Sequence, residues 1–153
     1  MRPIDRPNQS YQSDGAVPPF DDSRILLVMD GECALCSGAA RRIARWDKAD
    51  QVRIAPVRSP LGQALLAHYG LNPDDPASWL MVEDGHAYGS LTAILRLGRR
   101  LSPAFSALAW LGWLPETVQD WLYARLARNR YALFGRDDLC ALPDEDLRRR
   151  LVH

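Results

Sequence analysis

The apolar positions along the first half of the chain fall into two short continuous runs with a helical pattern between them. Residues 24–29, RILLVM, form the first run, and residues 52–57, VRIAPV, form the second. Such runs are typical of strands that are buried on both faces of a parallel sheet. Residues 36–46 instead place apolar side chains on one side and arginines on the other, which predicts a helix.

The following segments add a second helix, a hairpin and a third helix. Residues 60–70 start with a proline and end with a glycine, as helices often do. Residues 79–90 read as two strands around Asp84-Gly85, a pair that favours a two-residue hairpin turn. Ser90 is then expected to cap a helix through Arg99. This order predicts a thioredoxin-like α/β core (βαβαββα).

The two ends of the chain differ from this core. Residues 1–22 are rich in Pro, Ser, Asp and Gln without periodicity, so we expect a flexible, disordered leader. Residues 23–153 are expected to form a single domain, in which residues 103–153 are a helical C-terminal extension. Residues 103–123 are strongly apolar and contain no Lys or Arg, which favours packing in the core over an interfacial membrane helix.

The overall charge and the cysteine count exclude several classes of protein. The 153-residue chain has 19 basic and 19 acidic residues, so no long-range field attracts nucleic acid. No window reaches the length of about 18 apolar residues that a membrane span needs. Three cysteines and no apolar signal run favour the reducing cytoplasm, where a pair of cysteines is more often catalytic or metal-binding than structural. The oligomeric state stays open.

The segment MDGECALCSGAA (residues 29–40) carries the candidate chemistry. Cα atoms three residues apart on a helix are about 5 Å from each other, which suits a reversible disulfide between Cys33 and Cys36. The N-terminus of a helix favours a thiolate at Cys33, and Cys36 is expected to be the more shielded thiol. Asp30 is a candidate proton acceptor for Cys36, and capping of the turn is the alternative role for this residue.

Two other interpretations of the cysteine pair remain open. A structural zinc site needs four ligands, and this pair supplies two. The other candidate ligands, Cys140, His68, His86 and His153, form no second paired motif, so no metal or other cofactor is expected. In the second interpretation, the two cysteines are small buried residues without a chemical role.

The motif Asp30-x-x-Cys33-x-x-Cys36, directly after an apolar strand, resembles the DCC family of predicted thiol-disulfide oxidoreductases. The resemblance extends from residue 24 to residue 151 and includes APVRSPLGQALLAHYGL, VEDGHAY and NRYALFGRDDLCALP. It implies a thioredoxin-like fold and functional roles for Asp30, Cys33 and Cys36. Cys140 matches a cysteine that recurs in the C-terminal segment of the family.

The sequence therefore predicts an enzyme that exchanges disulfides with a protein or a glutathione-like thiol. Cys33 attacks as a thiolate, and Cys36 resolves the mixed disulfide. Arg41 and Arg42 are candidate substrate-binding residues, and a solvated helix face is the alternative explanation for them. Trp79 and Pro76 are further candidates. Pro76 is the proline nearest to the position where thioredoxin-like proteins place a cis-proline, and the alternative is that the site lacks this proline. The alternative is a non-catalytic module that docks residues 103–123 on a protein or a membrane surface.

Overall fold

The computed structural model describes residues 11–152, except residues 73, 75–78 and 139–143. The elements in chain order are η1 (Tyr11–Ser13), β1 (Ile25–Met29), α1 (Ala34–Trp46), β2 (Val52–Pro56), α2 (Pro60–His68), β3 (Leu80–Glu83), β4 (His86–Tyr88), α3 (Ser90–Leu101), η2 (Pro103–Trp113), α4 (Glu116–Phe134) and α5 (Glu145–Arg148). The two η elements are 3-10 helices. None of the helices in the described part of the chain combines the length and apolar character needed to cross a bilayer.

The strands form one sheet in the order β2-β1-β3-β4. β1 pairs with β2 in parallel, whereas β3 pairs with β1 and with β4 in antiparallel register. All five residues of β1 are buried, as expected for a strand with neighbours on both sides and helices on both faces. This arrangement confirms the predicted thioredoxin-like α/β fold.

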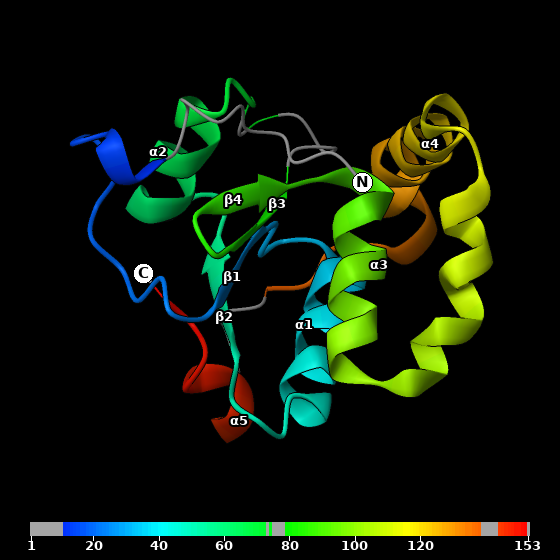
Figure 1. Ribbon diagram of the computed structural model, residues 1–153, viewed down its shortest axis with the longest axis horizontal. Coiled ribbons are helices and arrows are strands. Elements are labelled where there is room, and N and C mark those ends of the chain that lie inside the picture. The colour runs from blue at the N-terminus through cyan, green and yellow to red at the C-terminus, as the bar shows by residue number, and fades with distance from the viewer. Residues whose placement is uncertain (1–10, 73, 75–78, 139–143, 153) are drawn as a thin grey trace.

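Helices cover both faces of the sheet (Figure 1). One face packs against α1 and α3 through a core cluster centred on Leu27, Ile54, Met81 and Ala93. The other face packs against α2, whose Leu65 joins the second core cluster. α4 then lies against α1 and α3, outside the layer that those two helices form.

Local backbone chemistry explains the hairpin and the start of α2. Asp84 and Gly85 both have positive φ angles, 51° and 80°, as a type I′ turn requires, so the predicted hairpin is confirmed. Ser59 caps α2 by accepting a hydrogen bond from the Gly62 N–H. A Cβ at Gly62 would lie 2.3 Å from the Pro56 carbonyl oxygen, so α2 packs closely on the end of β2 only with glycine at this position.

The N-terminal boundaries of two helices differ from the sequence prediction. α1 begins at Ala34 rather than at Cys36, because Cys33 is extended and occupies the N-cap position. The predicted capping role of Ser90 is wrong, because Gly89 is the N-cap and Ser90 is already the first residue of α3.

Two aromatic side chains of the segment expected to be a disordered leader pack against the domain. Tyr11 in η1 is buried, and Phe20 packs against the same core cluster as α2. The two rings lie 5.2 Å apart between centroids. Burial of two aromatic side chains supplies the apolar contact that the composition of residues 1–22 does not suggest. Residues 1–10 of the expected leader lie outside the described residues.

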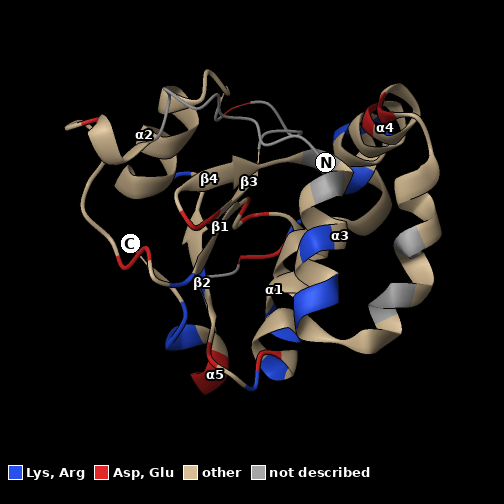
Figure 2. Ribbon diagram, viewed as in Figure 1, with Lys and Arg blue, Asp and Glu red and all other residues tan. Residues whose placement is uncertain are grey.

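The apolar segment at residues 103–123 does not pack in the core as predicted. Trp113 is 91% exposed, and Trp110 and Trp121 are also exposed. η2 runs along α3, and Figure 2 shows no charged residue on it. One helix and one 3-10 helix on the outer side of α3 leave too little protein above them to cover these indole rings.

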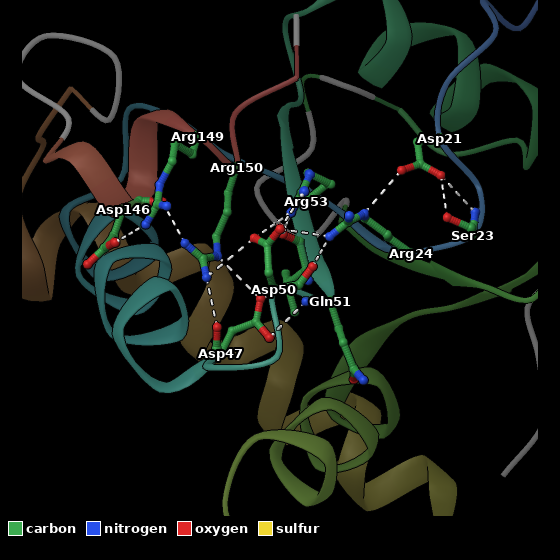
Figure 3. Close-up of polar contacts among 11 residues, drawn as sticks. Asp21, Ser23, Arg24, Asp47, Asp50, Gln51, Arg53, Asp146, Arg149 and Arg150 are labelled. Atoms are coloured by element: carbon green, nitrogen blue, oxygen red, sulfur yellow. Dashed lines mark hydrogen bonds and ion pairs between the residues drawn. The ribbon is translucent and has the colours of Figure 1, made fainter.

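The C-terminal end of the chain is fixed by a buried ion pair at the end of α1 (Figure 3). The Arg150 Nε–H donates to Asp47 Oδ2 at 3.2 Å, and both side chains are almost fully buried. Asp47 also accepts hydrogen bonds from the backbone N–H groups of Gln51 and Val52. Residues 150–152 then continue along β2, where the Ile54 N–H donates to the Arg150 carbonyl.

Replacing Arg150 with Met is expected to lower the free energy of unfolding by about 3–5 kcal/mol, because Asp47 stays buried without its cation. The matched variant Arg149→Met removes an exposed pair with Asp146 and is expected to cost at most about 1 kcal/mol. Urea denaturation of both variants measures the difference. An equal decrease in the free energy of unfolding in the two variants would contradict the structural role given to the Asp47–Arg150 pair.

Candidate dithiol site

The two cysteines meet at the junction between β1 and α1. Cys33 is the N-cap of α1, and Cys36 is the third residue of the helix. Both are free thiols, and Cys33 lies close enough to Cys36 to raise the pKa of that thiol. Cys33 is fully buried, whereas Cys36 is partly exposed. The expectation that Cys36 is the more shielded thiol is therefore wrong.

Cys33 is buried because residues 135–137, here called the covering segment, cross over it directly after α4. The Ala34 N–H donates to the Gly135 carbonyl at 3.3 Å, and the Asp137 N–H donates to the Glu32 carbonyl at 3.0 Å. Gly135 makes the turn out of α4 with a φ of 79°, a conformation that favours glycine. The covering segment thus forms a short β-bridge to the cysteine loop and closes Cys33 from solvent.

Asp30, the third residue of the motif, is held by two side chains of α4. The Arg130 Nη2–H donates to Asp30 Oδ2 at 2.6 Å, and the Tyr131 hydroxyl donates to the same oxygen. Asp30 Oδ1 accepts the Glu32 N–H at 2.8 Å, so the carboxylate also fixes the loop that leads to Cys33. The turn-capping role considered for Asp30 is present in this bond, and its role as a proton acceptor stays a prediction.

Arg130 also contacts the dithiol. Its Nη1 lies 3.7 Å from Cys36 Sγ, within hydrogen-bonding range for sulfur, and its side chain is almost fully buried. Burial raises the pKa of the Cys36 thiol well above its ordinary value, while the Arg130 guanidinium acts in the opposite direction. Cys36 is therefore a protonated thiol at neutral pH with a cation beside it.

The structure places the other predicted site residues in different environments. Arg41 forms an ion pair with Asp137 at 3.0 Å and so holds the covering segment. Arg42 and Trp79 line a cavity beside Cys36. Pro76 and Cys140 lie outside the described residues. The substrate-binding roles of Arg41, Arg42, Trp79 and Pro76 stay predictions.

Arg130 and Tyr131 were missed as site residues, and only the structure shows the face of α4 on which Arg130 lies. Gln119, Ala127 and Arg130 are buried and Tyr123 is half-buried, at spacings of three or four residues that define one face of α4. An arginine on the buried face of a helix needs an acidic partner. That partner lies 100 residues away in the sequence, which no local pattern indicates.

The described residues contain no group of three or more His, Cys, Asp or Glu side chains that are arranged to hold a metal ion. His68, one of the candidate ligands, lies 2.7 Å from Asp14 through its Nδ1, and Cys33 and Cys36 are not part of that contact. Cys140 and His153 lie outside the described residues.

The fold and the site together define a thioredoxin-like protein with a dithiol at the start of its first helix. A family model described as DCC1-like thiol-disulfide oxidoreductase matches residues 27–136. A DCC family protein of Arabidopsis thaliana, described as chloroplastic, is 36% identical over 123 residues, which cover 80% of this chain and 72% of that protein. The uncharacterized protein YuxK of Bacillus subtilis is 32% identical over 127 residues, which cover 83% of this chain and 93% of that protein.

No solved structure matches the chain. The chain belongs to the DCC1-like thiol-disulfide oxidoreductase family, as the resemblance of its motif indicated. The covered range includes the last three residues of β1, the cysteine motif, Arg130 and the first two residues of the covering segment.

The ionisation of Cys36 gives a direct test of the electrostatics at the site. In the Cys33→Ser, Cys140→Ser double variant, alkylation of Cys36 by iodoacetamide is expected to accelerate beyond about pH 9, above the ordinary thiol midpoint of about 8.5. The reason is that burial raises the pKa of Cys36. Rates measured by mass spectrometry across the pH range give the midpoint, with glutathione as the reference thiol. A plateau reached below about pH 8 would contradict this description.

Proposed function

We propose that the protein is a thiol-disulfide oxidoreductase that exchanges disulfides with a protein or a small thiol through Cys33 and Cys36. The contact between the two free thiols at the N-terminus of α1 carries this proposal. Cysteines at the N-cap and at the third helical position have Cα atoms at a separation that a disulfide accepts. The family name describes the same chemistry.

The mechanism needs two thiols with unequal environments. One sulfur forms a mixed disulfide with the substrate, and the other attacks that bond, releases the substrate and closes the protein disulfide. Cys33 is fully buried at the N-cap of α1, whereas Cys36 is partly exposed and has the Arg130 guanidinium beside it. This difference supports a division of roles within the pair.

Arg130 supports the proposal as a positioning residue. It holds Asp30 through an ion pair and places a cation within 3.7 Å of Cys36 Sγ. A cation near a sulfur stabilises the thiolate that forms whenever the disulfide opens. Asp30 is the proposed proton acceptor, at the end of the buried strand that precedes the cysteine loop. The cytoplasmic location expected from the sequence stays a prediction.

A second candidate function is docking through the exposed apolar side chains of residues 103–123. The observation that favours it is the exposure of Trp110, Trp113 and Trp121, which core packing does not explain. The two candidates separate in the Cys33→Ser variant. A docking module keeps its partner in this variant, whereas an oxidoreductase loses exchange.

Single-turnover exchange with a peptide that contains one internal disulfide tests the catalytic proposal. The reduced wild-type protein is expected to release reduced peptide and to gain the Cys33–Cys36 disulfide. Cys33→Ser and Cys36→Ser are each expected to release none, because closure of the protein disulfide needs both sulfurs. Mass spectrometry after acid quenching measures the products.

The Cys140→Ser variant is the matched control and is expected to release reduced peptide as the wild type does. Release of reduced peptide by both single variants of the pair would overturn the proposed function.

A further inference from the structure

A cavity of about 350 Å³ lies beside Cys36, between α1, α3 and α4. Small-molecule sites in proteins span about 300–1,000 Å³, so the cavity suits a small ligand. Its walls are mainly apolar and include Leu35, Ala39, Ile43, Leu97, Leu101 and Leu126. Transfer of an apolar molecule from water into this cavity is therefore favourable.

Only one sulfur of the pair belongs to the lining of this cavity. Cys36 lines it, together with Asp30 and Arg130. Cys33 is fully buried beneath the covering segment. A molecule in the cavity therefore reaches the sulfur of Cys36 first.

Hydrogen-bond donors without acceptors lie in the same walls. The Nε1–H of Trp79 and the Nε–H of Arg130 are buried and have no hydrogen-bond partner among the residues that the structure describes. Arg130 as a whole is only 5% exposed. Arg42 adds an exposed cation to the lining. Buried donors are normally satisfied, so a ligand that fits this cavity carries acceptor oxygens, preferably with negative charge.

We propose that the cavity binds an aliphatic thiol or dithiol that carries a carboxylate or carbonyl group, and that this substrate exchanges its sulfur with Cys36. The inference rests on the proposed thiol-disulfide function and names the substrate class. The apolar walls select the aliphatic body, the unpartnered donors select the acceptor group, and the position of Cys36 in the lining selects the reacting sulfur.

The proposed exchange oxidises the substrate and reduces the protein disulfide. A substrate thiolate attacks Cys36 Sγ in the Cys33–Cys36 disulfide, a bond forms between substrate and Cys36, and the electron pair of the broken bond goes to Cys33 Sγ.

A second substrate thiolate, in the same dithiol or in a second molecule, then attacks the sulfur bonded to Cys36. The substrate disulfide forms, and Cys36 leaves and takes up a proton, as its raised pKa favours. The protein disulfide thereby gains the two electrons that the two substrate thiols lose and becomes a dithiol.

Opening of the protein disulfide by a monothiol tests the proposal, because the mixed disulfide accumulates. The oxidised wild-type protein is mixed with mercaptooctanoate, an aliphatic thiol with a carboxylate, or with glutathione as the polar thiol. We expect saturable opening with mercaptooctanoate, a linear dependence on glutathione concentration, and an adduct that fragment-ion mass spectrometry places on Cys36.

Variants test the cavity itself. Trp79→Phe keeps an aromatic ring but removes the donor, and is expected to raise the half-saturating concentration of mercaptooctanoate about tenfold, as for loss of a hydrogen bond to a charged group. Trp113→Phe, on the exposed η2, is the matched control and is expected to leave the half-saturating concentration unchanged. Ala39→Phe fills the cavity and is expected to abolish saturation. Ala132→Phe, at an exposed position of α4, controls for the added ring.

The outcomes separate this inference from the proposed function. An adduct on Cys33, or equal and unsaturated rates with both thiols, would overturn the cavity proposal while the dithiol chemistry stands. If Ala39→Phe fails to fold, as thermal unfolding would show, the Trp79→Phe comparison decides alone. Failure of both thiols to open the disulfide, or failure of the disulfide to form, would overturn the proposed function as well.

Discussion

The ion pair between Arg130 and Asp30 is the contact on which the organisation of the site depends. It joins the end of β1 to α4 across 100 residues of sequence, and Arg130 contacts Cys36 through a second nitrogen. Because both side chains are largely buried, loss of either one leaves a charge without its partner, which is costly in a protein interior. α4 also leads directly into the turn at Gly135 and the covering segment, which forms a β-bridge to Cys33 and buries it.

The C-terminal extension is therefore part of the dithiol site. α4 supplies Arg130 and Tyr131 to Asp30, and the covering segment closes Cys33 from solvent. The thioredoxin-like core contributes the cysteine loop, between the end of a buried strand and the start of α1. The extension then decides which sulfur is accessible, and it contributes walls of the cavity that opens on Cys36.

Local sequence pattern was sufficient for most of the fold. The apolar run before Asp30 and the Asp84-Gly85 turn predicted a strand and a hairpin that the structure contains, since burial and turn geometry leave direct signals in neighbouring residues. Contacts between distant segments leave no such signal, so the shielding of Cys33 and the partner of Arg130 were not predicted. The exposure of Trp113 was missed for a related reason, because composition does not tell which side of a helix layer an apolar segment will occupy.

The central claim is that Cys33 and Cys36 form a reversible redox couple. Its most direct test is the redox state of the peptide that contains both cysteines, measured by thiol trapping and mass spectrometry in buffers of defined potential, with the metal content of the protein recorded first. The account predicts one reversible two-electron transition between about −300 and −120 mV in metal-free protein. A pair that stays in the dithiol form at every potential, or that holds stoichiometric zinc and cannot close, would contradict it.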